Sequence, residues 1–403
     1  MDIAIIGGGA SGMILASKLK NKNVTLFEKN AKLGKKLLLT GNGKCNFTNM
    51  DFENLNEIYN NDFAKNTYKK YDNISFINYF KELGIVPKVE VHKGIKYLYP
   101  NSNKATSVYY NLLDKIKDNK IDIVLNANIE SILYKNNKFI LETADNKFEF
   151  DKVVISTGGT SYKNTGSNGS GYILAKSLGH SIKPTFPGLC ALKTENKDLK
   201  DLKGIRVDGR VIADFDNIHF KEVGEIQFTD FGISGIPIMN LSRKVSPYLS
   251  KPIEIRLDFS VALNDSISET DVEKYLIDRK NKVCYKDIKD FLCGFLPDEL
   301  CDIIIKRSKV VSKKIASLNE KELSDLSNNI TNFKVTINGT ADFNNAQITI
   351  GGINTDEIYE ATLESKLIKN LYFTGEVLDI DGKCGGYNLQ LAYSTASIVA
   401  DSL

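Results

Sequence analysis

Short continuous runs of apolar residues recur along the chain and end at glycine or at an acid. The first run, residues 2–6, leads into Gly7 and then into a longer apolar stretch over 13–19. A continuous apolar run predicts a strand buried on both faces, as in a parallel sheet, and the longer stretch predicts a helix. Similar runs lie at residues 24–28, 151–155 and 371–376, and a long helix is expected from about residue 386.

The middle of the chain has two other periodicities. Apolar and polar residues alternate in short segments up to about residue 263, which is typical of antiparallel β structure, and helical spacing follows. We therefore expect an α/β fold in which a Rossmann-like domain is interrupted by an antiparallel, barrel-like β subdomain and a small helical subdomain. The expected boundaries are 1–188 and 351–403 for the Rossmann-like domain, 189–263 and 332–350 for the β subdomain, and 264–331 for the helical insertion.

The turn after the first strand has the Gly-x-Gly-x-x-Gly spacing of a dinucleotide site. Gly7 permits a tight turn, Gly9 lets a pyrophosphate approach the backbone, and Gly12 lets the helix pack against the strand. Ala10 and Ser11, which lie in the turn before that helix, are also expected to contact the cofactor. The free N–H groups and partial positive charge of the helix N-terminus would face the phosphates.

Other residues indicate which dinucleotide is bound. Glu28 ends the second run, where a carboxylate binds the hydroxyls of an unphosphorylated ribose, as in FAD or NAD. A turn, a second acid and a second helix N-terminus would serve a cofactor that extends as far as a flavin. An NAD-dependent dehydrogenase would leave this second set unexplained. The set consists of Thr157, Gly158, Gly159, Gly375, Glu376, Gly386, Tyr387, Asn388 and Leu389.

Composition excludes several other classes of protein. The 53 Lys and Arg residues nearly balance 50 Asp and Glu residues, so the net charge of +3 suggests no nucleic-acid partner. No apolar stretch approaches the roughly 20 residues of a membrane helix, and no basic segment precedes the first strand. We expect a cytoplasmic protein without a membrane partner. The six cysteines lack metal-ligand spacing, so no metal site is expected.

Six segments of the chain, taken in order, resemble one known family. They are residues 7–12, 35–46, 156–159, 229–237, 350–353 and 374–382. Together they resemble the YhiN-like bacterial flavoproteins, which carry names such as aminoacetone oxidase family FAD-binding enzyme and NAD(P)/FAD-dependent oxidoreductase. The resemblance covers almost the whole chain and implies non-covalent FAD in a Rossmann-like FAD-binding domain. It adds Lys29, Lys36, Gly43, Cys45, Asn46 and Ile129 to the expected cofactor contacts.

The residues that would act on a substrate are less evident, and the candidates are Cys45, Lys44 and Tyr387. Cys45 follows Lys44, a neighbouring cation that could lower the pKa of the thiol and make it reactive. A buried cysteine would instead only pack beside the flavin ring. Tyr387 is either a proton donor or a cover for the ring. Of the histidines, His180 follows a helix-ending glycine and is expected to pack, while His92 and His219 are expected on the surface.

We expect an FAD-dependent oxidoreductase that acts on an unidentified small molecule, with NAD(P)H or oxygen as redox partner. Family names suggest amine oxidation or enone reduction, and the residues select neither. The alternative is an FAD-binding redox or structural module that acts through a protein or RNA partner. The sequence leaves the oligomeric state open.

Overall fold

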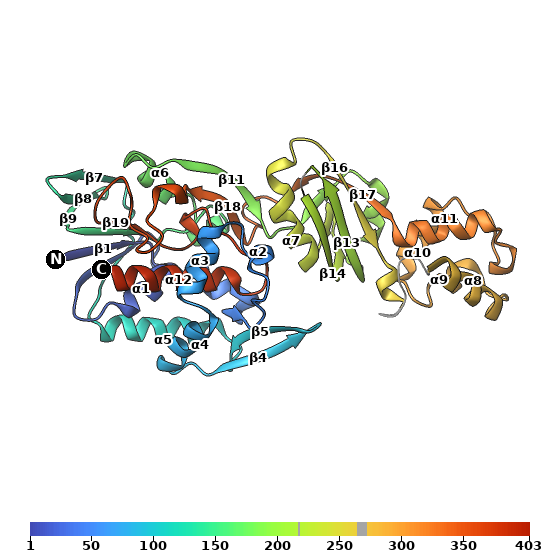
Figure 1. Ribbon diagram of the computed structural model, residues 1–403, viewed down its shortest axis with the longest axis horizontal. Helices are drawn as coiled ribbons and strands as arrows, with labels where there is room; N and C mark the ends of the chain where they lie inside the picture. Colours follow the sequence, from blue (N-terminus) through green and yellow to red (C-terminus); the bar gives the residue numbers. More distant parts are fainter. Residues whose placement is uncertain (217, 264–271) are drawn as a thin grey trace. The chain divides into compact units, whose positions relative to one another are not determined.

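The computed structural model describes residues 1–216, 218–263 and 272–403 (Figure 1). These residues form two compact units. Unit 1 consists of Met1–Pro187 and Phe343–Leu403, and unit 2 consists of Gly188–Asp342. Unit 1 is therefore built from both ends of the chain, as the blue and red parts of Figure 1 show.

A five-stranded parallel sheet lies at the centre of unit 1, with the strand order β19-β10-β1-β2-β6. Residues 3–6 of β1 are buried, as expected for a central strand covered on both faces. The predicted Rossmann-like sheet is confirmed. Its strands are β1 (Asp2–Ile6), β2 (Asn23–Glu28), β6 (Asp122–Leu125), β10 (Lys152–Ile155) and β19 (Leu371–Phe373).

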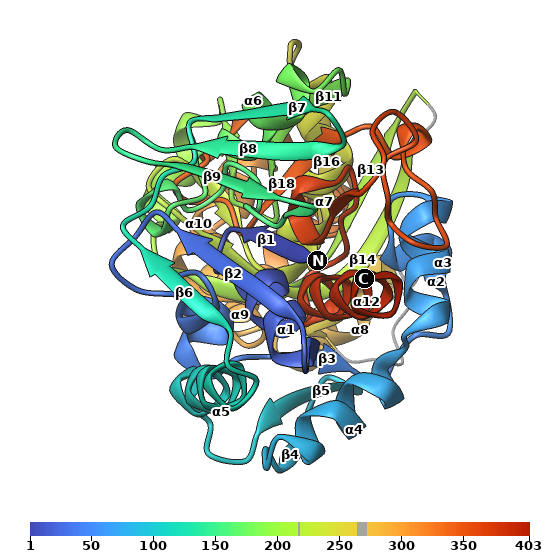
Figure 2. The ribbon, with the colours of Figure 1, turned by 90° about the vertical axis from the view of Figure 1, so that its left-hand side faces the viewer.

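Helices from opposite ends of the chain pack side by side on this sheet. Figure 2 shows α1 (Ala10–Lys18) next to α12 (Tyr387–Ser402), with α5 (Ala105–Asp118) beside α1. Most of α12 is buried because further helices cover its outer side. These are α3 (Asp62–Lys70) and α4 (Asn73–Glu82); the short α2 (Leu55–Ile58) precedes them.

Two small antiparallel sheets complete the surroundings of the parallel sheet. One of them packs against the parallel sheet: Phe148 of the small sheet lies edge-on against Phe27 of β2, with ring centroids 5.1 Å apart. A turn through Asn136 and Asn137, both with positive φ, closes the hairpin of β7 and β8. The sheets are β7 (Ser131–Lys135), β8 (Lys138–Glu142) and β9 (Lys147–Phe150), and β3 (Thr48–Asn49), β4 (Pro87–His92) and β5 (Ile95–Pro100).

One predicted boundary is wrong. Residues 347–350 were expected to return to the β subdomain, but β18 (Ile348–Ile353) pairs with β11 (Ile182–Gly188) in unit 1. Unit 1 therefore resumes at Phe343 and not at residue 351. The helix α6 (Ser170–Ser177) precedes β11 and packs near β18.

Unit 2 contains the expected antiparallel barrel, which is closed in the order β12-β15-β14-β13-β16-β17. Burial alternates along β16 and β17, so one side of each strand faces the barrel core. The helix α7 (Ile236–Val245) packs against β14. The strands are β12 (Leu192–Thr194), β13 (Arg206–Phe215), β14 (Ile218–Phe228), β15 (Gly232–Ser234), β16 (Ile253–Asp258) and β17 (Phe333–Thr340).

The expected helical insertion lies between β16 and β17 and joins the core of unit 2 through buried residues such as Leu276, Phe291 and Ile304. Asn319 is the N-cap of the helix that begins at Glu320, and the side chains of Asn319 and Glu322 form a capping box. Residues 264–271, the predicted start of the insertion, lie outside the described residues. The helices are α8 (Val272–Lys282), α9 (Ile288–Leu292), α10 (Asp298–Arg307) and α11 (Glu320–Thr331).

Among the described residues, no helix combines the length and the apolar character that crossing a membrane requires.

Candidate cofactor site

The glycine turn between β1 and α1 has the geometry that its spacing predicted. Gly7 has a φ of +105°, and a Cβ there would lie 2.7 Å from the Ser156 carbonyl oxygen. A Cβ on Gly12 would lie 2.0 Å from the carbonyl oxygen of Gly7. Both positions therefore require glycine. A Cβ on Gly9 would meet no atom within 4 Å, so the space beside this backbone is open to a ligand.

A cleft opens at the carboxyl ends of β1 and β2. This edge of a parallel sheet is where Rossmann-like proteins bind their dinucleotides. The walls come from the glycine turn, the end of β2 and the segments at 34–36, 127–129 and 165–170. Seven of the predicted cofactor residues line the cleft: Gly7, Gly9, Glu28, Lys29, Lys36, Ile129 and Thr157.

The Glu28 carboxylate is fixed at the wall of this cleft. Its Oε2 accepts a hydrogen bond from the Gly8 amide at 2.9 Å, and its Oε1 accepts bonds from the backbone and side-chain nitrogens of Asn30 at 2.8 and 2.6 Å. Glu28 is 8 % exposed. A carboxylate oxygen can accept two hydrogen bonds, so Oε2 retains capacity for a ribose hydroxyl.

Residues 165–168 are tied to the end of β2 by two contacts that the sequence did not reveal. Asn30 Nδ2 donates to the Thr165 carbonyl at 3.1 Å, and Lys29 Nζ donates to Asn168 Oδ1 at 2.5 Å. Burial lowers the pKa of Lys29, although Glu28 acts in the opposite direction. These contacts hold the loop along the same cleft that Glu28 lines.

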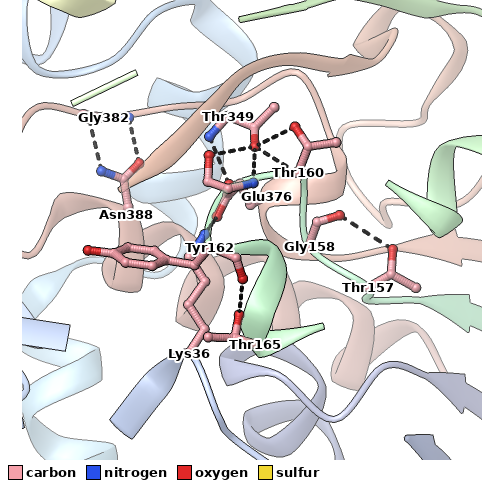
Figure 3. Close-up of polar contacts among 11 residues, drawn as sticks. Lys36, Thr157, Gly158, Thr160, Tyr162, Thr165, Thr349, Glu376, Gly382 and Asn388 are labelled. Atoms are coloured by element: carbon pink, nitrogen blue, oxygen red, sulfur yellow. Dashed lines mark hydrogen bonds and ion pairs between the residues drawn. The ribbon is translucent and has the colours of Figure 1, made fainter. Parts of the chain in front are cut away.

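Glu376 and Lys36 form the second charged element of the site. Lys36 Nζ lies 2.8 Å from Glu376 Oε2, and the Thr349 amide donates to Glu376 Oε1 at 2.8 Å (Figure 3). The Thr349 hydroxyl accepts in turn from the backbone amide of Thr160 at 2.8 Å. A Cβ on Gly375 would lie 2.6 Å from Ser11 Oγ, so the Gly-Glu turn packs closely on the start of α1. Thr349 was not predicted, because no local motif marks it.

Several other predicted residues form a second group outside the cleft lining, where the loop at 43–46 meets the N-terminus of α12. A Cβ on Gly386 would lie 2.7 Å from the Thr48 carbonyl oxygen and 2.9 Å from Asn46 Oδ1. Asn388 holds this turn through two hydrogen bonds with Gly382, at 2.8 and 2.9 Å (Figure 3). Leu389 follows in the first turn of α12, and Gly43 ends the short helix Leu37–Gly43.

Neither candidate for substrate chemistry in this group has the properties of a reactive residue. Cys45 is fully buried, and burial raises the pKa of its thiol to about 12, which favours the packing alternative over a reactive thiol. The adjacent Lys44 is exposed. The Tyr387 hydroxyl donates to the Asp51 carbonyl at 2.9 Å, which fits a packing role next to the α12 N-terminus.

The three histidines lie away from the cleft lining. His180 is buried, with Nδ1 2.9 Å from Glu357 Oε2 and Nε2 2.8 Å from Ser365 Oγ, so its predicted packing role is confirmed. The side chains of His92 and His219 are 63 % and 80 % exposed, as predicted.

These residues fit FAD. The N-terminus of α1 and the open space beside Gly9 suit a diphosphate, and Glu28 suits the adenosine ribose. Lys36 and Glu376 offer one cation and one acceptor further along the same site. The fold and this donor set define a Rossmann-like dinucleotide-binding protein with the fold of FAD-dependent oxidoreductases.

The family is shown by the match of residues 1–402 to the model described as HI0933-like protein Rossmann domain. The chain belongs to this family, which confirms the resemblance drawn from its motifs.

Two relatives cover nearly the whole chain. A 3-dehydro-bile acid delta(4,6)-reductase of Clostridium scindens is 34% identical over 98% of this chain and 96% of its own length. A ribosomal RNA dihydrouridine synthase of Escherichia coli is 28% identical over 100% of this chain and 98% of its own length. Among solved structures, a flavocytochrome c3 fumarate reductase is similar with a TM-score of 0.48 and 14% identity, over 99% of this chain and 77% of that one.

Proposed function

We propose that the protein is an FAD-dependent reductase that adds hydrogen across a carbon–carbon double bond conjugated with a carbonyl group. The observation that carries the proposal is the cleft lined by the glycine turn, Glu28 and Lys36, together with the ion pair that Lys36 forms with Glu376. FAD, when bound, supplies hydride transfer, and the protein supplies binding and orientation.

The reaction class is supported by what the names of the two relatives have in common. One name denotes reduction of a ring double bond in a 3-dehydro bile acid, and the other denotes formation of dihydrouridine. Dihydrouridine differs from uridine by hydrogenation of the C5–C6 bond, which is conjugated with the C4 carbonyl. Both names therefore describe hydrogen addition next to a carbonyl, although one substrate is a small molecule and the other is an RNA base.

Each part of the site has a distinct task in this proposal. The N-terminus of α1 binds the diphosphate, and Glu28 accepts hydrogen bonds from the adenosine ribose. The Glu376 carboxylate accepts from hydroxyls nearer the flavin, and Lys36 compensates the charge of that carboxylate. The α12 N-terminus, held in place by Asn388, favours negative charge on a ring that lies in front of it.

The test is reduction of defined substrates under anaerobic conditions. The purified protein, loaded with FAD, would be mixed with NADH or NADPH and either a 3-oxo-Δ4 steroid acid or an RNA that contains unmodified uridine. The proposal expects one substrate to gain two hydrogen atoms, as read by mass spectrometry, while the nucleotide is oxidised. Reduction of the flavin by a nucleotide without any change in either substrate, in every combination of donor and acceptor, would contradict it.

A further inference from the structure

The helical insertion of unit 2 separates its charges into two parts. Residues 279–289 carry five cations and one carboxylate, and residues 306–314 carry five cations and no carboxylate. The rest of 272–331 carries nine acids and two lysines. The chain's net charge of +3 conceals this separation, because the acids of α9, α10 and α11 offset the cations in the sum.

The two cationic segments lie side by side. The Ile288 amide donates to the Lys313 carbonyl and the Ile315 amide to the Lys286 carbonyl, both at 3.1 Å. Asp287, the single carboxylate, pairs with Lys314 at 2.9 Å. The Glu322 side chain also accepts from the Val311 amide at 3.1 Å, which holds the second segment in place. We call residues 279–289 and 306–314 together the basic surface.

Half of the cations on the basic surface are available to an anion. Lys289, Arg307 and Lys314 each pair with an acid. Lys280 donates to a backbone carbonyl, and Arg279 donates to a tyrosine hydroxyl and a carbonyl. The other five form no ion pair with any residue in the described part of the chain: Lys282, Lys286, Lys306, Lys309 and Lys313.

The position of these lysines matters as well as their number. Lys282 and Lys306 lie in the last turns of α8 and α10, where a cation also stabilises the helix dipole. Lys309 and Lys313 lie between helices, so that explanation does not apply to them. Two uncharged side chains on the same surface are unusually exposed, Tyr285 at 72 % and Val311 at 88 %.

We propose that the basic surface binds the phosphate backbone of a structured RNA. Unpaired lysines on two adjoining segments, one of which also carries the exposed Tyr285, offer phosphate contacts together with a ring on which a base can stack. This inference rests on the proposed function in one respect, because the RNA would carry the uracil that the flavin site reduces. It differs from the expectation that the protein has no nucleic-acid partner, which was based on the net charge of the chain.

The test measures binding without turnover. The oxidised full-length protein is titrated into a fluorescein-labelled RNA hairpin with uridine in its loop, and anisotropy is followed at several KCl concentrations. Lys309→Gln/Lys313→Gln is compared with Lys274→Gln/Lys321→Gln, which removes two exposed lysines of the same insertion outside the basic surface. The first variant should bind roughly tenfold more weakly at 0.1 M salt, with a salt slope lower by about 1.5 to 2. The control should match wild type.

Two additional variants test the contribution of charge and the contribution of base stacking separately. Lys309→Arg/Lys313→Arg should restore affinity, because phosphate contacts need only the charge. Tyr285→Ala should weaken binding roughly fivefold without changing the salt slope, because stacking releases no counterions. Absence of RNA binding by wild type, equal losses in the test and control variants, or preference for phosphatidylserine vesicles over the hairpin would overturn the proposal. Because these readouts need no hydride transfer, they are independent of whether the flavin site reduces uracil.

Discussion

At the scale of single residues, the site depends on Glu28, whose carboxylate already accepts three hydrogen bonds at the end of β2. Glu28→Ala should remove the ribose contact. A charge-assisted hydrogen bond contributes about 1.5–3 kcal/mol, so the Kd for FAD should rise roughly 10- to 100-fold. Fluorescence titration of apoprotein with FAD measures this change. Glu149→Ala, which removes a carboxylate that is 61 % exposed, is the matched control and should leave the Kd unchanged.

Substitutions at Gly9 and Gly12 should have different effects, the first on FAD binding and the second on folding. Valine at Gly9 would point into open space, so Gly9→Val should fold with a thermal midpoint close to that of wild-type apoprotein and yet bind no FAD. Valine at Gly12 would clash with the Gly7 carbonyl, so Gly12→Val should unfold at a lower temperature or fail to fold. Calorimetry of the apoproteins measures the thermal midpoints of both variants, and titration with FAD measures their cofactor binding. Full flavin retention by Gly9→Val would remove Gly9 from the site.

At the scale of elements, His180 connects the end of the α6 segment to Glu357 and Ser365. Burial lowers the pKa of His180 from its ordinary value of 6.5. The unfolded chain therefore takes up this proton at a higher pH than the folded protein does. The stability present above pH 6.5 is consequently lost as the pH falls toward the folded pKa, with a slope of at most about 1.4 kcal/mol per pH unit.

His180→Asn should remove this slope. Urea unfolding between pH 7.5 and about 5.5 measures it. His219→Asn, at an exposed position, should keep the wild-type slope. The same slope in wild type and His180→Asn would show that other groups cause the acid sensitivity.

The strands and helices also show which parts of the fold could be predicted from the sequence. The β1 strand, its glycine turn and α1 were predicted because each depends on residues that are neighbours in the sequence. The partner of β18 was not predicted, because strand character does not reveal that Ile348–Ile353 pairs with a strand far away in the chain. Thr349 was missed for a similar reason, since only the folded chain brings Thr349 next to Glu376.

At the scale of the whole molecule, charge illustrates a similar limit. A sum over 403 residues gives +3 and argues against nucleic acid, whereas the fold joins two cationic segments that the intervening α9 and α10 separate in the sequence. Which segments adjoin is a tertiary property. The FAD site has the same character, because β10 pairs with β1 on one side and with the C-terminal β19 on the other.

The central claim is that unit 1 binds FAD between these two ends of the chain. The most direct test is the absorption spectrum of the purified protein. One sample is then precipitated with acid, and NADH or NADPH is added anaerobically to another. The account predicts flavin bands near one FAD per chain, release of all the yellow colour into the supernatant, and bleaching by a reduced nicotinamide. A colourless protein that neither retains FAD nor binds it on titration would contradict the account.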